Sequence, residues 1–205
     1  MTGLAGWTPP PAPSRETTPG RHMRLAPLTV DHAPGLHRAT RGHDRLWDWM
    51  PYGPLATEDA WRDWLRAMVR GADPLFFAIE VAGTPLGVAS YLRIAPAAGA
   101  IEIGHICLSP RLQRTAAATE ALTAMIGWAF RAGYRRVEWK CDALNRPSRD
   151  AALRLGLSYE GTFRQASVVK GRNRDTAWYA AIDAEWPALS TAYEAWLAPG
   201  NFDKD

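Results

Sequence analysis

The stretch from residue 100 to residue 142 constrains the fold most, because strand, loop, helix and strand patterns follow one another there. Residues 100–108 are mostly apolar, residues 114–132 carry apolar side chains at helical spacing, and residues 136–142 form a second apolar-rich strand. Two parallel strands need a long crossover connection, which a helix of this length supplies. The stretch therefore predicts a βαβ unit with one parallel strand pair.

The segments on either side predict antiparallel strands and further helices. Residues 75–81, 86–94 and 100–108 are separated by small-residue turns, and residues 157–182 contain a hairpin that turns at Lys-Gly-Arg-Asn. A first strand is expected at residues 22–28. The remaining predicted helices span residues 31–41, 57–70, 145–155 and 185–197. A mostly antiparallel sheet with one parallel crossover is a mixed α+β fold.

The chain has the composition of a globular protein, with 205 residues, 47% of them hydrophobic and 22% charged. Residues 1–20 hold five prolines and predict a disordered or extended arm. Residues 21–198 predict a single domain, and residues 199–205 a C-terminal tail. The sequence has no apolar run of roughly 18 residues, so no transmembrane helix and no membrane partner are expected.

The N-terminus lacks the basic and apolar regions of a secretory signal. Cys107 and Cys141 fall within apolar strand patterns, which predicts buried free thiols rather than a disulfide. Both observations favour a cytoplasmic protein. No metal is expected, because His32, His37 and His43 have spacings that fit no metal site well.

Positive charge is concentrated in the middle of the chain. Between Arg111 and Arg149 there are eight Lys or Arg against three acidic residues, a balance of +5; the rest of the chain holds sixteen against eighteen, a balance of −2. This cluster suits an anionic ligand. A nucleic-acid groove would need more contiguous basic surface with interleaved aromatic side chains, so no nucleic-acid partner is expected.

The loop that leads into the long helix has the composition of an anion site. Residues 110–118 read Pro-Arg-Leu-Gln-Arg-Thr-Ala-Ala-Ala. The first N–H groups of a helix have no intrahelical partner, and with the helix dipole they bind anions such as phosphate. The sequence therefore predicts a phosphate-binding turn at the start of this helix.

Residues 99–161 resemble the acetyl-CoA-binding core of the GNAT N-acetyltransferases, in particular the RimJ/RimL-like branch. The resemblance covers about residues 22–187. It implies the GNAT acyl-CoA N-acyltransferase fold, acetyl-CoA as co-substrate, and transfer of an acetyl group to a primary amine by direct attack in a ternary complex. The loop fits the family pattern Gln/Arg-x-x-Gly-x-Gly/Ala except at Ala116, which stands where the family usually has glycine.

The resemblance also implies a cofactor site. In the family, the strand before the loop binds the pantetheine arm through its backbone, and an N–H there polarises the thioester carbonyl. An Asn-x-x-Ser pattern holds the pantetheine and places a hydroxyl near the sulfur. The implied cofactor-binding residues are Ile106, Cys107, Leu108, Gln113, Arg114, Thr115, Ala116, Ala117, Ala118, Asn145 and Ser148.

Glu102 is the expected general base, because it is a carboxylate within an apolar strand and matches a general-base glutamate of several GNAT enzymes. Its alternatives are a structural ion pair with an arginine, or substrate binding. Ser148 is expected to act as proton donor or water anchor, although Asn145 and Ser148 could also simply cap a helix. His105 falls on the opposite face from Glu102 if the strand is regular.

The sequence indicates the acceptor pocket less specifically than the cofactor site. Trp47, Trp49, Met50 and Tyr52 look like one wall, and the hairpin containing Arg172 like the opposite rim. The expected acceptor is a small amine (amino acid, dipeptide or aminoacyl conjugate) or a protein N-terminus such as that of a ribosomal protein. The alternative function is a catalytically inactive, acyl-CoA-binding regulatory protein. The apolar C-terminal helix is expected either to cover the sheet or to pair with a second subunit in a homodimer.

Overall fold

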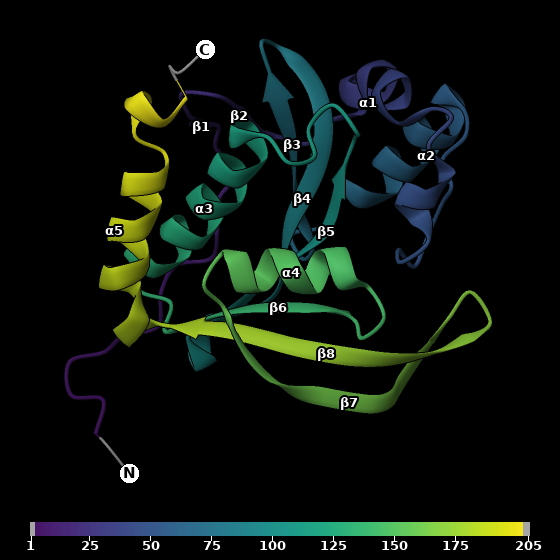
Figure 1. Ribbon diagram of the computed structural model, residues 1–205. Helices are drawn as coiled ribbons and strands as arrows, with labels where there is room; N and C mark the ends of the chain where they lie inside the picture. The colour runs from purple at the N-terminus through teal and green to yellow at the C-terminus, as the bar shows by residue number, and fades with distance from the viewer. Residues whose placement is uncertain (1–2, 203–205) are drawn as a thin grey trace.

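The computed structural model describes residues 3–202 of the chain. These residues form one eight-stranded sheet with helices packed on it (Figure 1). The strands are β1 (Thr18–Pro19), β2 (Arg24–Pro27), β3 (Leu75–Val81), β4 (Thr84–Ala95), β5 (Ala100–Leu108), β6 (Arg136–Asp142), β7 (Ser158–Val169) and β8 (Arg172–Ile182). The α-helices are α1 (Ala33–Thr40), α2 (Glu58–Met68), α3 (Ala116–Arg131), α4 (Arg146–Arg154) and α5 (Trp186–Trp196).

The strand order is β1-β2-β3-β4-β5-β6-β8-β7. Every neighbouring pair is antiparallel except β5 and β6, which are parallel. The helix that connects these two strands is α3, as the sequence predicts. The predicted mixed α+β fold with one parallel crossover is therefore confirmed.

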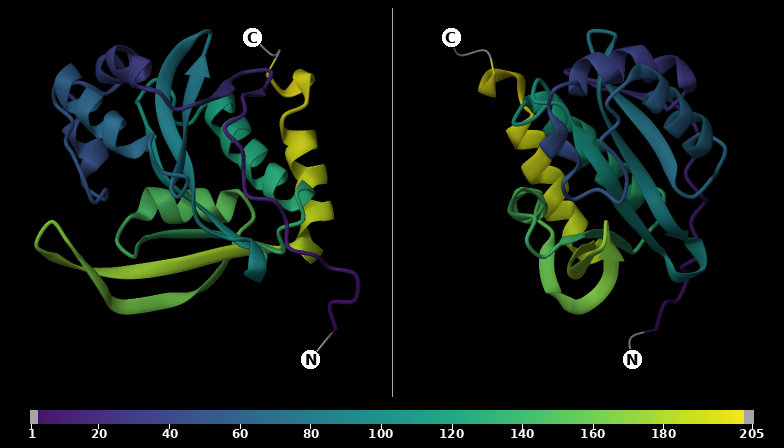
Figure 2. Two further views of the ribbon diagram at one scale, coloured as in Figure 1. Left: turned by 180° about the vertical axis from the view of Figure 1, so that it is seen from behind. Right: turned by 90° about the vertical axis from the view of Figure 1, so that its right-hand side faces the viewer.

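Helices cover both faces of the sheet (Figures 1 and 2). On one face, α3 packs against the strands and α5 packs on α3, so the core there includes Ile103, Leu122 and Met125. On the other face, α1 and α2 lie over the N-terminal half of the sheet, around the fully buried Trp61 and Leu36. The two cores hold the central strands from both sides, which fixes the position of β5.

Side-chain caps set where the helices begin. Thr57 accepts a hydrogen bond from the N–H of residue 60 at the start of α2, and Thr115 does the same for Ala118 at the start of α3. The helix predicted from residue 114 therefore begins two residues later. Arg114 has a left-handed backbone (φ 59°) that no α-helix accommodates.

The described residues of the N-terminal arm run along the body of the domain (Figure 2). The Trp7 indole Nε1 donates to the carbonyl of Gly133 at 3.3 Å, and its ring lies under the Arg135 guanidinium. The Tyr134 hydroxyl donates to the carbonyl of Pro11. These contacts dock a proline-rich segment that forms no helix of its own.

At the C-terminus, α5 uses Trp186 and Tyr193 to pack against the core on the α3 side. Residues 199–201 form a short 3-10 turn, and the rest of the predicted tail, residues 203–205, lies outside the described residues. Cys107 and Cys141 are free and buried, as predicted. None of the helices in residues 3–202 is long and apolar enough to cross a membrane.

Candidate active site

The parallel strands β5 and β6 separate soon after they begin. Their paired residues end at Glu102 and Glu138, although β5 continues to Leu108 and β6 to Asp142. The β6-facing edge of β5 therefore has no strand partner beyond Glu102. Such an edge presents backbone N–H and C=O groups to a ligand.

A β-bulge in β5 lies at the point where the strands separate. Ser90 of β4 pairs with Gly104, but Val88 pairs with Cys107, so β5 carries one extra residue. His105 within the bulge has a positive φ of 50°. Because the strand is irregular here, the prediction that His105 faces away from Glu102 is wrong: both side chains line one cavity.

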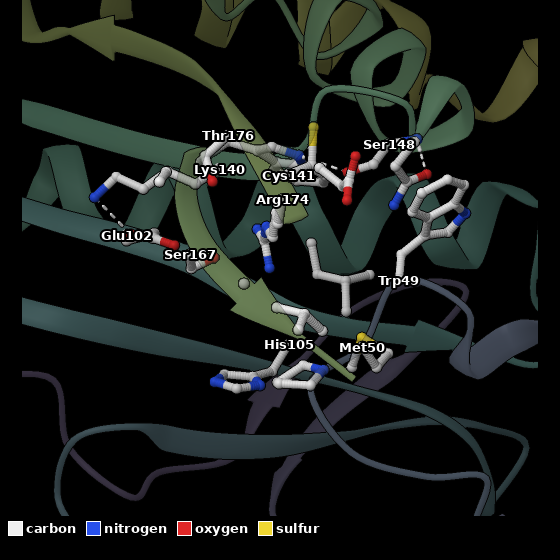
Figure 3. Close-up of a pocket in the computed structure, with 18 of the residues that line it drawn as sticks. Trp49, Met50, Glu102, His105, Lys140, Cys141, Ser148, Ser167, Arg174 and Thr176 are labelled. Carbon is white, nitrogen blue, oxygen red and sulfur yellow. Dashed lines mark hydrogen bonds and ion pairs between the residues drawn. The ribbon is translucent and has the colours of Figure 1, made fainter. Parts of the chain in front are cut away.

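This cavity has a volume of about 490 Å³ and lies between β5, β6, the start of α4 and the β7–β8 hairpin (Figure 3). The predicted site residues that line it are Trp49, Met50, Glu102, Ile106, Asn145 and Ser148. Charged or polar lining residues that were not assigned a role from the sequence include Arg93, His105, Lys140, Asp142, Ser167, Arg174, Thr176 and Trp178.

His105 lies in an aromatic setting. Its ring stacks on Tyr52 at 5.7 Å between centroids and contacts Phe76 at 5.1 Å, and its Nδ1 is 3.3 Å from the Tyr52 hydroxyl. Burial lowers the pKa of His105, and the positive charges of Arg93 and Arg174 lower it further. His105 is therefore a neutral imidazole near pH 7.

Glu102 is held in ion pairs. It is 3% exposed, and its Oε2 lies 2.6 Å from the Arg93 guanidinium and 2.8 Å from Lys140 Nζ. Lys140 also contacts Glu138 at 2.7 Å, and its ammonium sits 3.7 Å from the centre of the Trp178 ring. These contacts favour the alternative in which Glu102 forms a structural ion pair with an arginine. Glu102 also lines the cavity, so a ligand bound there can reach it.

The start of α4 forms another wall of the cavity. The Asn145 side chain caps the helix by accepting the Ser148 N–H at 3.2 Å. The Trp139 indole N–H donates to the Ser148 hydroxyl at 2.9 Å, so that hydroxyl keeps its own proton for donation. Burial raises the pKa of the Cys141 thiol, which a hydrogen bond with Ser148 partly offsets.

Arg174 projects into the middle of the cavity between His105 and the wall formed by Cys141 and Ser148 (Figure 3). Its Nε is buried and has no hydrogen-bond partner within residues 3–202. The same holds for the indole Nε1 of Trp178 on the same strand. Both residues line the cavity, and these two buried nitrogens have no acceptor in the described chain.

The loop before α3 presents a second set of free donors. Thr115 Oγ1 engages the N–H of Ala118, but the backbone N–H groups of residues 114–117 have no hydrogen-bond partner within the described part of the chain. Ala116 is the first helical residue and lacks a positive φ, so glycine is not needed there. The N–H groups and the exposed Arg111 and Arg114 can hold a phosphate.

Some predicted site residues lie away from the cavity. Trp47 is buried in the core, where it packs on Tyr52 and Trp61, and it does not line the cavity. Arg172 lies near the tip of the β7–β8 hairpin, beyond the lining residues. The Gln113 amide donates to the Leu108 carbonyl at 2.9 Å, which braces the loop against β5.

Two residues missed from the sequence had a detectable signal. A glycine inside a strand pattern, here Gly104, is typical of a bulge, and a bulge at that point brings His105 onto the same side as Glu102. Arg174 lies in the hairpin that was expected to form the rim, two residues after the predicted Arg172. Its lack of a carboxylate partner depends on the tertiary packing and has no sequence signal.

Comparison with known proteins identifies the family. The profile of the acetyltransferase (GNAT) domain family matches residues 22–158. A GCN5-related N-acetyltransferase from Brucella melitensis has a similar structure with 46% identity, a TM-score of 0.95, and coverage of 98% of this chain and 94% of that one. The chain belongs to the GNAT acetyltransferase family, and it is an acyltransferase. No curated protein matches it.

Two further structures are similar over most of the chain. A probable GNAT acetyltransferase from Chromobacterium violaceum ATCC 12472 is 41% identical, with a TM-score of 0.87 and coverage of 91% of this chain and 96% of that one. An acetyltransferase from Salmonella typhimurium that modifies the N-terminal serine of the 50S ribosomal subunit protein L7/L12 is 25% identical. Its TM-score is 0.70, with coverage of 82% of this chain and 99% of that one.

Proposed function

We propose that the protein is an acetyl-CoA-dependent N-acetyltransferase in which a primary amine attacks the thioester directly while both substrates are bound. The observation that carries this proposal is the separation of β5 and β6 next to the free N–H groups at the start of α3. The residues of the loop and of the β5 edge fit a pyrophosphate and an extended pantetheine arm. Bound there, acetyl-CoA supplies the activated acetyl group.

The proton transfers are assigned to residues on opposite walls of the cavity. His105 accepts the proton that the amine must lose through Nε2, in the tautomer whose Nδ1–H is directed to the Tyr52 hydroxyl 3.3 Å away. Ser148, whose hydroxyl oxygen already accepts from Trp139, donates its proton toward the departing thiolate and regains one from solvent, while His105 releases the proton of the amine to solvent. Glu102 acts by fixing Arg93 and Lys140 at the cavity wall.

The acceptor is either a small amine, such as an amino acid, dipeptide or aminoacyl conjugate, or a protein N-terminus. The aromatic and partly enclosed cavity supports the small amine. The similarity to the Salmonella enzyme that modifies a ribosomal protein supports the N-terminus and a place in the RimJ/RimL-like branch. The proposed cellular location is the cytoplasm.

The first experiment is thermal unfolding with and without saturating acetyl-CoA. A ligand at about 100 times its Kd adds about 2.7 kcal/mol to the free energy of unfolding, which shifts the Tm of a domain of this size by roughly 5 °C or more. Release of free thiol with a panel of amines then measures turnover. A Tm shift without turnover would favour the inactive regulatory alternative, and no Tm shift would refute both.

A further inference from the structure

The charge of Arg174 is uncompensated in the described chain. The other two cationic side chains that line the cavity are paired: Arg93 contacts Glu102, and Lys140 contacts Glu102 and Glu138. Asp142 also lines the cavity but forms no ion pair with Arg174, and its Oδ1 accepts the N–H of residue 144. A partly buried guanidinium without a carboxylate partner is costly, unless a ligand supplies the anion.

Two residues of β8 that carry an unsatisfied donor line the same cavity. Arg174 and Trp178 are four residues apart on one strand, so their side chains lie on the same face. The buried Nε of Arg174 and the buried Nε1 of Trp178 both lack acceptors among residues 3–202. The Lys140 ammonium against the Trp178 ring fixes that indole. A carboxylate, with two acceptor oxygens, matches the paired N–H donors of a guanidinium.

Arg174 lies close to the groups proposed to carry the chemistry. Its side chain lies between His105 and the wall formed by Cys141 and Ser148 (Figure 3), and its positive charge adds to the lowering of the His105 pKa and opposes the raising of the Cys141 pKa. A carboxylate on Arg174 would therefore hold a nearby amine beside His105. Trp49, Met50 and Phe163 supply apolar surface for the rest of the molecule.

We infer that Arg174 binds a carboxylate group of the acceptor, so that the enzyme acetylates amines that carry an acid group close to the amine. This inference rests on the proposed function and narrows its acceptor class. The carboxylate can come from the α-carboxyl of a free amino acid or from an acidic side chain at the N-terminus of a peptide. Cationic protein tails are disfavoured by the unpaired positive charge.

The test compares acceptors that differ only in the carboxylate. The kcat/KM is measured by thiol release for free amino acids with aliphatic and aromatic side chains, for their primary amides, and for amidated dipeptides that begin with Asp or with Ala. An amide has the less basic amine, so a preference for the free acid cannot arise from amine ionisation. We expect the acids to exceed the amides by about tenfold to a hundredfold.

The variants Arg174→Gln and Arg174→Lys assign this preference to one side chain. Arg174→Gln is expected to lower kcat/KM for the acids to the level of the amides while the KM for acetyl-CoA stays within about twofold. Arg174→Lys, which keeps the charge, retains part of the preference and serves if the Gln variant fails to fold. Arg66→Gln, an exposed arginine on α2, is the matched control.

The outcomes separate this inference from the proposed function. Equal kcat/KM for acids and amides, or equal losses for both in Arg174→Gln, would overturn the inference while the acetyltransferase stands. If no amine is acetylated, calorimetric titration with free amino acids and their amides decides: Arg174-dependent binding of acids alone supports the carboxylate site, and its absence refutes it. The comparison of the amidated dipeptides that begin with Asp or with Ala shows whether a side-chain carboxylate can replace the α-carboxylate.

Discussion

His105 and Glu102 are three residues apart on β5, which in a regular strand places them on opposite faces. The extra residue of the bulge brings them to one cavity, at the cost of a left-handed backbone at His105. Their surroundings then divide their roles. Glu102 forms ion pairs with Arg93 and Lys140, whereas one ring nitrogen of His105 has no partner among the described residues.

The pH dependence of the rate tests the role of His105. A base must be unprotonated to act, and the pKa of His105 is lowered from 6.5. The kcat/KM of the wild type should therefore fall as the pH drops through that lowered pKa. His105→Asn, which tolerates a positive φ, should lose this acidic limb and about a hundredfold in rate.

Glu102→Gln is the matched comparison for that pH profile. It removes the ion pairs with Arg93 and Lys140 while keeping the side-chain shape, so we expect a slower and less stable enzyme that retains the acidic limb. If Glu102→Gln abolishes the limb and His105→Asn leaves it intact, Glu102 is the base, as expected from the sequence.

At the scale of elements, the start of α3 combines three features in a few residues. Arg114 turns the chain with a positive φ, Thr115 caps the helix, and Ala116 begins it with an unpartnered N–H. The small side chains of the first turn leave the backbone open to a ligand. The departure from the family glycine is harmless here, because Ala116 occupies an ordinary helical position.

Ala116→Asp separates anion binding from helix stability. An aspartate in the first turn favours the helix dipole and should raise the free energy of unfolding by about 0.3–1 kcal/mol. The same charge repels a phosphate, so the Tm shift with acetyl-CoA should vanish.

Ala116→Gly is the control for this substitution and should keep the Tm shift. Differential scanning fluorimetry with and without acetyl-CoA measures all three proteins. An unchanged ligand-induced shift in Ala116→Asp would mean that the phosphate binds elsewhere.

On the scale of the whole molecule, the sheet is held between two cores, and the N-terminal arm crosses the body to reach the start of β6. Trp7 covers Gly99, where a Cβ would lie 2.8 Å from the indole, and it contacts Gly133 and Arg135. These contacts join the arm to the turns on either side of the α3 crossover. The arm therefore stabilises the scaffold at a distance from the cavity.

Trp7→Ala should lower the free energy of unfolding by about 1–2 kcal/mol, because it removes one hydrogen bond and one cation–π contact. The kcat/KM should stay unchanged, since Trp7 lies outside the cavity lining. Urea unfolding measures the first quantity and thiol release the second. Leu4→Ala, at an exposed position, is the control; equal stability of both variants would show that the arm is not docked in solution.

Much of the fold could be predicted from local patterns. The bounds of β3, β5 and β6 were predicted to the residue, since strand alternation and the glycines and prolines at the turns are local signals. The cap at Asn145 was also predicted, because capping depends on a side chain and an N–H within three residues. The start of α3 was missed by two residues, since a positive φ at an arginine has no composition signal.

The sequence by itself determined the order of elements, the parallel crossover and the donor-rich turn at α3, because each depends on residues close together in the chain. Only the tertiary structure decided which side chains share the cavity. The bulge places His105 at the cavity. Glu102 forms ion pairs with Arg93 and with Lys140, whereas Arg174 has no carboxylate partner among the described residues. Pairing between side chains from distant strands depends on sheet register and burial, which local patterns do not encode.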